Sequence, residues 1–415
     1  MEIKSVYLST AGIKLGLREN WRQFMLLVII NGFVGGMLGI ERTLLPQLAK
    51  EVFGINSFTA ILSFIVVFGT VKAFANLYAG KLASRVGRKN LLVIGWIAAL
   101  PVPFLLLYGP SWNWILAANV LLGINQGLCW STAVMMKIDL AGVKNRGLAM
   151  GINEFAGYFS LALIAFLTGY LAAHYGLKPY PFYLGILISF AGLFGSVFLI
   201  TDTEKHVKLE ASKPENSKYE EGKKLVKNVF RNTTWQSKNI SSVTQAGLIN
   251  NLNDAMVWGL FPLLLASKGF NLAQIGLIVA IYPAVWGISQ LFTGILADQY
   301  KRKTLLFWGM LMQGLVLFML PLFSGYYFYI LMATLLGLAT ALVYPTFLAA
   351  VADFSHPYQR AHSIGIFRFW RDSGYVFGAI LTGLIIDQFN YSTAIFAVAA
   401  LTTLSAIIII FRMNE

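Results

Sequence analysis

A ten-residue stretch occurs twice in this chain, and the two copies start 214 positions apart. Residues 80–89 read Gly-Lys-Leu-Ala-Ser-Arg-Val-Gly-Arg-Lys, and residues 294–303 read Gly-Ile-Leu-Ala-Asp-Gln-Tyr-Lys-Arg-Lys. The same offset aligns further residues without a gap, among them Gly95 with Gly309, Asp139 with Asp353, and Gly169 with Gly383. Agreement over so long a distance indicates a tandem duplication. Any fold for this chain must therefore consist of two similar halves.

Apolar runs of about 20 residues recur along both halves, and 57% of all residues are hydrophobic against 12% charged. About 20 helical residues cross the roughly 30 Å hydrocarbon core of a bilayer, and long apolar runs are typical of helices rather than of barrel strands. We predict an all-α membrane protein with twelve transmembrane helices in two repeat-related six-helix bundles. The predicted spans are 24–46, 58–79, 91–109, 113–136, 147–172, 181–200, 242–265, 272–293, 304–323, 326–348, 362–386 and 392–411.

A polar linker separates the two predicted bundles. Residues 1–200 form the N-terminal bundle, 201–239 the linker and 240–415 the C-terminal bundle. Within the linker, apolar side chains lie beside basic ones: Leu225, Val226, Val229 and Phe230 with Lys223, Lys224, Lys227 and Arg231. This pattern fits an amphipathic helix on an anionic membrane surface. A solvated linker with one short helix fits equally well.

Basic side chains gather in alternate loops, which orients the chain across the plasma (inner) membrane as a multi-pass protein. Each copy of the duplicated stretch is predicted to form a tight basic turn, and we place both turns and both termini in the cytoplasm. The basic residues expected in cytoplasmic turns are Lys81, Arg85, Arg88, Lys89, Lys137, Lys144, Arg146, Lys301, Arg302, Lys303 and Arg360. The outer loops are expected to hold little beyond Lys50, Lys178 and Lys268.

Composition argues against several other classes of protein. The formal charge of +14 does not predict nucleic-acid binding, because the basic residues lie between membrane spans. The single cysteine, Cys129, excludes a disulfide within the chain. Without a phosphate-binding Gly-x-x-x-x-Gly-Lys-Ser/Thr loop, the chain is not expected to use ATP. We expect neither enzymatic activity nor a cofactor.

The two halves, the polar linker and the Gly-x-Leu-Ala-x-x-x-Gly-Arg-Lys stretch after span two resemble the major facilitator superfamily. The resemblance implies the twelve-helix MFS fold and alternating access, with the duplicated turns latching the halves in the outward-open state. The latch residues that it implies are Gly80, Arg85, Gly87, Arg88, Gly294, Asp298 and Arg302. The family usually has an acidic residue where this chain has Ser84, and the second copy keeps it as Asp298.

Proton-coupled drug exporters of that family carry an arginine in span four and a Gly-Pro pair in span five. The corresponding places here are Gly123 and Gly157-Tyr158, which is a departure from that pattern. Asn-Glu-Phe-Ala-Gly-Tyr around Glu154, residues 250–254, and Phe-Arg-Phe-Trp-Arg-Asp at 367–372 are instead similar to an exporter-like prokaryotic branch that includes nickel-efflux and magnetosome permeases.

Ionisable side chains inside the spans are the first candidates for function, because each is costly in a bilayer without a partner or a watery cavity. The eight candidates are Glu41, Arg42, Lys72, Glu154, Asp254, Arg368, Arg371 and Asp372. Span seven is the most polar, with Asn250, Asn253, Asp254 and Trp258 within about two helical turns and Asp254 near the midplane. We expect this group to contact the substrate or ion, and a hydrogen-bond cluster that only packs the bundle is the alternative.

Span eleven places Arg368, Arg371 and Asp372 on one helix face. Arg368 could pair with Asp372 four residues on, which would leave Arg371 as the freer cation, able to bind a carboxylate. A closed network that holds span eleven to its neighbour is the alternative. The 214-residue offset maps Glu154 onto Arg368, and Glu154 could bind a cation, carry a proton or form a structural ion pair.

Three further predictions concern single positions. Glu41 and Arg42 lie towards the outer end of span one and are candidates for an outer gate. Lys72 lies nearer the cytoplasmic end of span two and is expected to extend to the interface. The four histidines lie in loops or at span ends, so no histidine metal cage is expected and any metal stays unknown.

We therefore predict a secondary active transporter that works by alternating access, an ion- or proton-coupled exporter of a small molecule. Its expected partners are the small-molecule or ion substrate, H+ as the coupling ion and the lipid bilayer, and we expect a monomer. A divalent metal cation exporter, with Glu154, Asp254 and the asparagines as hard oxygen ligands, is one alternative. A non-transporting membrane sensor or scaffold on the same fold is the other.

Overall fold

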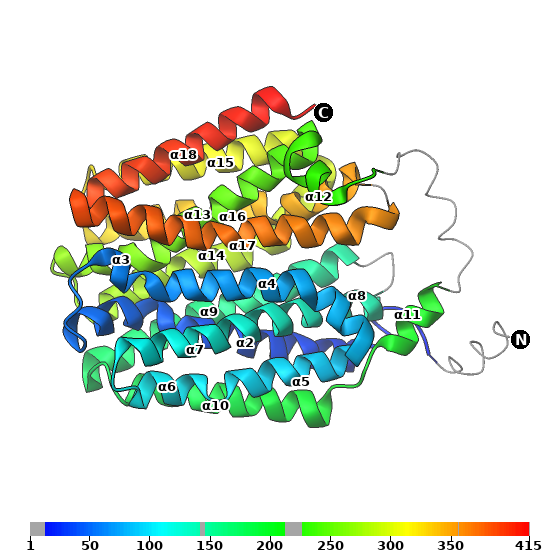
Figure 1. The fold of residues 1–415 in the computed structure, drawn as a ribbon, viewed down its shortest axis with the longest axis horizontal. Coiled ribbons are helices and arrows are strands. Elements are labelled where there is room, and N and C mark those ends of the chain that lie inside the picture. Colours follow the sequence, from blue (N-terminus) through cyan, green and yellow to red (C-terminus); the bar gives the residue numbers. More distant parts are fainter. Residues whose placement is uncertain (1–12, 142–145, 212–225, 356, 415) are drawn as a thin grey trace, which may run out of the picture.

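The computed structural model describes residues 13–141, 146–211, 226–355 and 357–414 and is helical throughout this part of the chain, with no strand in it. Its helices run side by side along one long axis (Figure 1). The segments of the N-terminal half are α2 (Trp21–Glu51), α3 (Phe58–Ile61) with α4 (Ser63–Val86), α5 (Arg88–Ala99) with α6 (Val102–Tyr108), α7 (Trp112–Asn125) with η1 (Gln126–Trp130) and α8 (Ser131–Ala141), α9 (Arg146–Tyr175), and α10 (Tyr180–Phe194) with η3 (Gly195–Leu199).

The C-terminal half repeats this arrangement with longer unbroken helices. Its segments are α13 (Lys238–Ser267), α14 (Leu272–Gln299), α15 (Arg302–Met319), α16 (Tyr326–Phe354), α17 (Pro357–Gln388) and α18 (Tyr391–Arg412). The sequence offset also relates the helix ends, since α5 begins at Arg88 and α15 at Arg302, and α7 begins at Trp112 and α16 at Tyr326. The described part of the chain thus contains twelve bundle segments, six in each half.

Seven of these helical segments are long and apolar enough to cross a membrane by length and composition alone, within the residues that the structure describes. Helix α17 is not among them, although it has 32 residues. The hydropathy of α17 is lowered by three charged side chains that lie in a five-residue stretch of this helix: Arg368, Arg371 and Asp372. The most polar helices are therefore the ones that hydropathy detects least well, and they prove to line the interior.

The duplicated stretches are mainly helical, so the prediction that each forms a turn throughout is wrong. Helix α4 continues to Val86, and the break falls at Gly87, whose φ of 84° is readily adopted only by glycine. Helix α14 likewise continues to Gln299, and only Tyr300 and Lys301 separate it from α15. Leucine and alanine in both stretches favour helix until a residue breaks it. Arg85 and Asp298 therefore lie on helix ends rather than in loops. The end of the bundle that carries both turns is called the turn end below.

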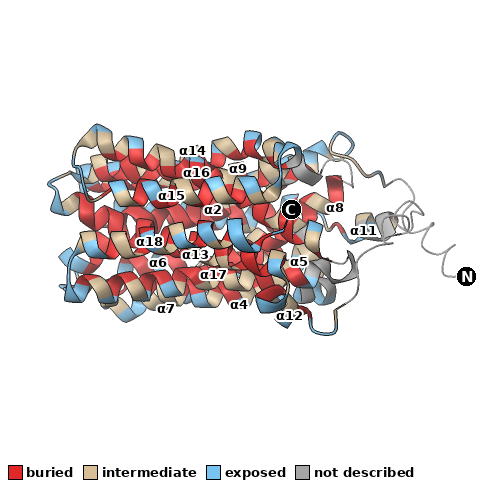
Figure 2. Cartoon of the chain, turned by 90° about the horizontal axis from the view of Figure 1, so that it is seen from above, coloured by how far each residue is buried: buried red, intermediate tan, exposed pale blue. Residues whose placement is uncertain are grey.

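Polar side chains gather inside the bundle and large apolar side chains cover much of its outside. Asn31, Asn119, Gln126, Asn250 and Asp254 are buried, as Figure 2 shows for the interior as a whole. Phe198, Phe292, Tyr327 and Phe411 are among the exposed apolar side chains. A soluble protein would keep such side chains inside, whereas a hydrocarbon solvent favours them on the surface.

The two halves meet chiefly along two helix pairs, α9 with α14 and α4 with α17, and also where α2 packs against α13 and α3 against α17. At the end opposite the turns these contacts are close. A Cβ atom added at Gly169 would lie 2.7 Å from Cα of Gly276, and one added at Gly383 would lie 2.7 Å from Cα of Thr59. Nearer the turn end, a Cβ atom added at Gly294 or Gly365 would meet no atom of the described residues within 4 Å. The halves are therefore packed tightly at one end and more loosely at the other.

The linker contains α11 (Glu204–Ala211), the single turn α12 (Val229–Arg231) and the π-helical turn η5 (Asn232–Gln236). Leu225, Lys223 and Lys224, which belong to the predicted amphipathic segment, lie outside the described residues. From residue 226 onward Val229 is buried and Phe230 is exposed, so these two side chains do not share one buried face. This part of the linker packs against α13 and α17.

Candidate transport site

A small cavity of about 20 Å³ lies where the two halves meet. Its lining is Lys72, Asn76, Trp130, Ser131, Glu154 and Tyr158 from the N-terminal half, with Tyr344, Leu348, Arg368 and Arg371 from the C-terminal half. Two pairs of these residues are related by the 214-residue offset, Trp130 with Tyr344 and Glu154 with Arg368. Equivalent positions of the two repeats thus face the same cavity, which has room for about one water molecule.

Glu154, on α9, has one satisfied and one unsatisfied carboxylate oxygen. Its Oε1 accepts hydrogen bonds from Nε1 of Trp130 at 3.0 Å and from Nδ2 of Asn153 at 2.8 Å. Its Oε2 is buried and has no hydrogen-bond partner. A buried oxygen without a partner costs about 1–3 kcal/mol, and more when it is charged. Oε2 is therefore ready to bind a proton or a donor group of a substrate.

Lys137 is linked to Glu154 through Asn153. The prediction that Lys137 lies in a cytoplasmic turn is therefore wrong. The side chain is only 1% exposed, and Nζ donates a hydrogen bond to Oδ1 of Asn153. Helix α8 continues to Ala141, so Lys137 is still one turn inside the helix. The predicted span 113–136 ends too early, because the last turn of α8 buries polar side chains and hydropathy therefore does not recognise it. Asn153 thereby connects the ammonium group of Lys137 to the carboxylate of Glu154.

Arg371 and Asp372 pair with each other, which reverses the predicted pairing of Arg368 with Asp372. Nη2 of Arg371 donates to Oδ1 of Asp372 at 2.9 Å, and Nη1 donates to the hydroxyl of Tyr344 at 2.9 Å. Asp372 also accepts hydrogen bonds from Asn251 on α13 and from Asn76 on α4 of the other half. The closed-network alternative therefore describes Arg371 and Asp372.

Arg368 is the cation of α17 that faces the cavity with spare donors. Nη1 donates to Oγ of Ser131 at 3.1 Å, whereas Nε has no hydrogen-bond partner. Ser131 in turn donates to Asn76, which donates to Asp372. Arg368 thus joins the network that crosses between the halves but keeps a buried N–H directed at no acceptor.

Asp254 forms a second centre among buried aromatic side chains. The hydroxyl of Tyr282 donates to Oδ1 of Asp254, and Oδ2 has no hydrogen-bond partner although Asp254 is fully buried. The positive charges that act on this carboxylate are those of Arg42, Lys72 and Arg371. Glu154 and Asp254 therefore share one feature, since each has one bonded oxygen and one free oxygen.

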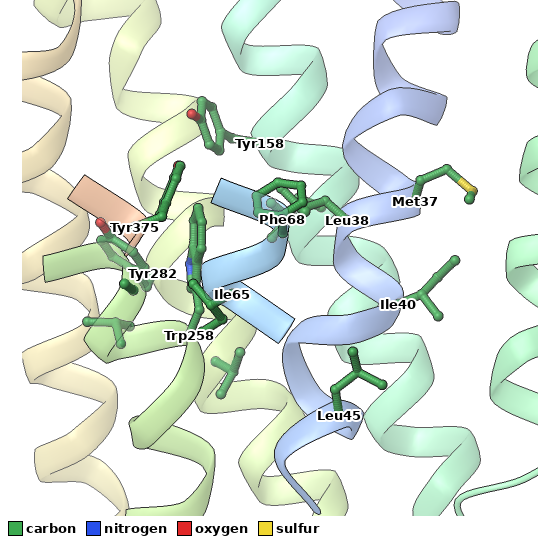
Figure 3. Close-up of a cluster of buried hydrophobic side chains, with 14 of the residues drawn as sticks. Met37, Leu38, Ile40, Leu45, Ile65, Phe68, Tyr158, Trp258, Tyr282 and Tyr375 are labelled. Atoms are coloured by element: carbon green, nitrogen blue, oxygen red, sulfur yellow. The ribbon is translucent and has the colours of Figure 1, made fainter. Parts of the chain in front are cut away.

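Arg42 and Trp258 connect the halves beside Asp254. The guanidinium carbon of Arg42 lies 3.9 Å from the centroid of the Trp258 ring, which is a cation–π contact. Trp258 also stacks on Tyr375 with 5.2 Å between the ring centroids. Figure 3 shows Trp258, Tyr282 and Tyr375 gathered near Phe68 of α4. Nε and Nη2 of Arg42 have no hydrogen-bond partner, and the carboxylates whose charges act on it are those of Glu41 and Asp254.

The two remaining asparagines of the span-seven group point to other helices. Nε2 of Gln313 on α15 donates to Oδ1 of Asn250, and Nδ2 of Asn253 donates to Oε1 of Gln313. Oγ1 of Thr402 on α18 donates to Asn253. The structure thus brings Asn250 and Asn253 together with each other, but within the C-terminal half and not with the cavity.

The outer-gate role of Glu41 and Arg42 stays a prediction, whereas the structure tests the position of Lys72. Glu41 lies on α2, where Oε1 accepts a hydrogen bond from Asn119 at 3.2 Å and Oε2 has no hydrogen-bond partner. Lys72 does not extend to the interface, and that prediction is wrong. Its ammonium lies 5.1 Å from the centroid of Tyr375 and 5.4 Å from that of Phe68, and it lines the cavity. Aromatic rings inside the bundle provide the contact that we expected from the headgroups.

The polar contact that joins the halves at the end opposite the turns is made by Asp387, which the sequence did not single out. Its carboxylate at the end of α17 accepts hydrogen bonds from the hydroxyl of Ser57 at 2.8 Å and from the backbone N–H groups of Phe58 and Thr59. A carboxylate from one half thereby caps the first turn of α3 in the other half. The only signal in the sequence was its position just beyond a predicted span.

The duplicated stretches make equivalent ion pairs in the two halves. Nε of Arg88 lies 2.6 Å from Oδ2 of Asp139, and Nε of Arg302 lies 3.0 Å from Oδ2 of Asp353. The offset relates both partners, and this pairing belongs within each half rather than between the halves. Gly80, Ser84 and Asp298 lie outside the residues whose side chains the structure describes. Their part in a latch stays a prediction.

No group of three or more histidine, cysteine, aspartate or glutamate side chains that could hold a metal ion occurs among the described residues. Glu154 and Asp254 bond to different partners and belong to separate centres.

With the geometry established, the chain can be compared with known proteins. The sequence profile described as Major Facilitator Superfamily matches residues 24–244 and again 243–415. The chain belongs to the Major Facilitator Superfamily. The double match corresponds to the two halves, and membership of this family makes the chain a multi-pass membrane protein and a secondary transporter.

Among curated relatives, this facilitator protein is 24% identical over 382 residues to the proton-coupled antiporter flippase LtaA of Staphylococcus saprophyticus, covering 89% of this chain and 88% of that one. It is 24% identical over 407 residues to the protein of the same name in Staphylococcus aureus, covering 92% of this chain and 94% of that one.

Among solved structures, a peptide transporter POT in complex with sulfate aligns with a TM-score of 0.71 at 14% identity, over 93% of each chain. A POT family transporter in complex with a thioalcohol-conjugated peptide aligns with a TM-score of 0.75 at 11% identity, over 94% and 95%. The solved structures are evidence for the fold.

Proposed function

We propose that this facilitator protein is a proton-coupled exporter of a small molecule, in which Glu154 and Asp254 take up and release the coupling proton. Its curated relatives are named proton-coupled antiporters, which supports proton coupling here. The observation that carries the proposal is the free Oε2 of Glu154 at a cavity that both halves line.

A free carboxylate oxygen gives a physical basis for exchange. An ionised oxygen without a partner in a buried site is unfavourable, and either a proton or a donor group of the substrate relieves it. The two cannot occupy Oε2 at the same time, so binding of one disfavours binding of the other. Reciprocal competition of this kind couples the two ligands in opposite directions, as an antiporter requires. Oδ2 of Asp254 offers the same choice deeper in the bundle.

Rocking of the halves would carry that exchange across the bilayer. We infer that the turn end faces the cytoplasm, since the duplicated stretches are basic. The close contacts of Gly169, Gly383 and Asp387 would then close the outer side, and the looser turn end would be the side that opens.

Cysteines introduced at Ser84 and Gln299 should react with an impermeant thiol reagent only from the inside. Labelling from the outside would contradict this orientation.

The test of the function is transport by purified protein in proteoliposomes. Counterflow against a panel of amphipathic drugs and metal ions first identifies a substrate, and an imposed pH gradient then drives its transport. We expect Asp254→Asn to abolish pH-driven transport with the protein still folded, and Glu154→Gln to weaken it. Glu51→Gln, which removes an exposed carboxylate at the end of α2, is the matched control and should leave the rate unchanged.

Full pH-driven transport by the Asp254→Asn/Glu154→Gln double variant would overturn the assignment. A metal cation exporter would give another result, because Asp254→Asn would then lower cation affinity with little change in proton stoichiometry. A sensor or scaffold on this fold would show no counterflow with any substrate in the panel.

A further inference from the structure

A hollow of about 630 Å³ lies on the outside of the N-terminal half, between α4 and the α7–η1 helix. Its walls include Val71, Phe74, Ala75 and Tyr78 from α4, with Ile124 and Leu128 from the facing helix. Thr70 lies near one end and Arg85 near the other. The hollow is separate from the central cavity, because none of its lining residues also lines that cavity. Its volume is in the range of about 300–1,000 Å³ that is typical of ligand pockets.

The hollow, called the α4 groove below, is longer than one leaflet of the hydrocarbon core. Helix α4 rises roughly 22 Å from Thr70 to Arg85 at 1.5 Å per residue. One half of the hydrocarbon core is only about 15 Å thick. If the apolar walls lie in the hydrocarbon, Arg85 reaches the level of the headgroups. The groove therefore runs from the bilayer interior to the membrane surface at the turn end.

A local irregularity of the backbone shapes the facing wall. Residues 126–130 form the π-helical turn η1, and Leu128 within it lines the groove. The repeat-related residues 340–344 remain in the regular α-helix α16. π-helical turns are often found at functional sites. The second half also differs in charge, because the residue related to Arg85 is Gln299.

The position of the α4 groove determines what can fill it. In the bilayer the surrounding solvent is acyl chains, and the apolar walls of the groove cannot hold ordered water. An acyl chain gains little by leaving the bulk lipid for the groove, because the groove walls and the bulk lipid are equally apolar. Preference for one lipid must therefore come from its headgroup. Arg85 is exposed at the mouth of the groove and can bind a phosphate with two parallel hydrogen bonds, and its positive charge favours a headgroup of net negative charge over a zwitterionic one.

We propose that the α4 groove is a binding site for one anionic phospholipid, with an acyl chain between α4 and η1 and the phosphate on Arg85. This lipid also lies beside the contact between the halves. The ring of Phe74 packs edge-on against Phe369 of α17, with 5.5 Å between the centroids.

The test is native mass spectrometry of the full-length protein in detergent, with equal amounts of phosphatidylglycerol and phosphatidylcholine that carry the same acyl chains. We expect one phosphatidylglycerol to be retained with about fivefold preference, the effect of one basic residue at an anionic surface. Arg85→Gln should abolish the preference, and Arg85→Lys should keep most of it. Lys301→Gln is the matched control, because it removes an exposed charge from the second turn and should leave the preference unchanged.

A second variant tests the groove independently of the charge. Thr70→Trp places a large side chain at the inner end of the groove, and Thr70 is exposed with its hydroxyl bonded only to the carbonyl of Val66 in its own helix. We expect this variant to lose the retained lipid of either headgroup. Equal losses of preference in Arg85→Gln and Lys301→Gln would overturn the proposal, because they would show a general charge effect. Unchanged lipid retention in Thr70→Trp would overturn it as well.

Discussion

The two ends of the bundle are built from the same duplicated sequence but pack differently. At the end opposite the turns, repeat-related Gly169 and Gly383 each contact the other half so closely that a Cβ atom would meet backbone at 2.7 Å. Towards the turn end, Gly294 and Gly365 also belong to the duplicated pattern, and within the described part of the chain a Cβ atom at either would meet nothing within 4 Å. Both ends retain glycine, but the contacts at the turn end are looser: a Cβ atom at Gly151, the repeat mate of Gly365, would lie 3.8 Å from the carbonyl oxygen of Gln290.

This difference shows which end of the bundle is closed in the structure. Glycines at both ends permit close approach of the helices, and in a rocking transporter the two ends approach alternately. The end opposite the turns is closed here, with Asp387 adding a polar contact between the halves. The loosely packed glycines of the turn end are then the surfaces that would meet in the opposite state.

The largest effect is expected from changing one glycine at the closed end. Gly383→Ala forces a Cβ atom against Thr59, and overpacking of this kind costs about 1–3 kcal/mol. The population of the closed arrangement should therefore fall by about 5- to 150-fold relative to the open one. Spin labels at Lys50 and Lys268, measured by pulsed electron paramagnetic resonance, report the distance between the halves at this end. Gly365→Ala adds the same methyl group to the same helix and should leave the distances unchanged, and equal shifts would contradict the comparison.

A smaller effect is expected from the carboxylate that joins the halves. Asp387→Asn keeps the side-chain shape but removes the charge from the helix cap, at a cost of about 1–2 kcal/mol. The same labels should show partial opening of this end. Glu51→Gln, an exposed carboxylate at the end of α2, should show none.

The contact of Asp387 also predicts a pH dependence. Asp387 lies just beyond the predicted span. Burial acts to raise its pKa, but hydrogen bonds from Thr59, Ser57 and Phe58 outweigh burial and hold the pKa below its usual value of 3.8. A lowered pKa in the closed arrangement means that the contact is fully present above that usual value and is lost as the pH falls through the lowered one. Opening on acidification below about pH 4 should disappear in Asp387→Asn, and an unchanged acid response would assign it to another group.

The ion pairs of the two duplicated stretches should differ in strength. The Asp139 side chain is 11% exposed and also accepts a hydrogen bond from Thr203, whereas the Asp353 side chain is 53% exposed. Solvent screens exposed pairs to about 0–1 kcal/mol. We therefore expect Asp139→Asn to lower the thermal unfolding midpoint of the purified protein clearly and Asp353→Asn to lower it little. A larger loss for Asp353→Asn would show that burial does not set the ranking.

The smallest effect is expected at the position where the duplicated stretches differ in charge. The first stretch has Ser84 at the position where the second has the acidic Asp298. We therefore expect Asp298→Asn to change the transport rate and the cysteine accessibility more than Ser84→Ala does. A difference of a few-fold is expected for groups near the membrane surface. Equal or reversed effects would show that this asymmetry has no role in the latch.

Sequence alone determined the helical membrane class, the twelve segments and the division into halves. These properties depend on local hydropathy and on a repeat, which a chain displays whether or not it is folded. Sequence also identified Glu154 and Asp254 as buried charges, because ionisable groups in apolar runs are rare. The helix ends were less well determined, since α8 continues past the apolar run to bury Lys137.

Only the tertiary structure decided which charges meet. Spacing along α17 favoured Arg368 as the partner of Asp372, but the packing of α17 against α4 and α13 brings Asn76 and Asn251 to that carboxylate and leaves Arg371 beside it. The same packing directs Lys72 towards aromatic rings and brings Asp387 to the first turn of α3. Such pairings depend on the rotation and register of one helix against another. Those two variables are set by contacts between residues far apart in the chain, such as Gly383 and Thr59, and no local pattern encodes them.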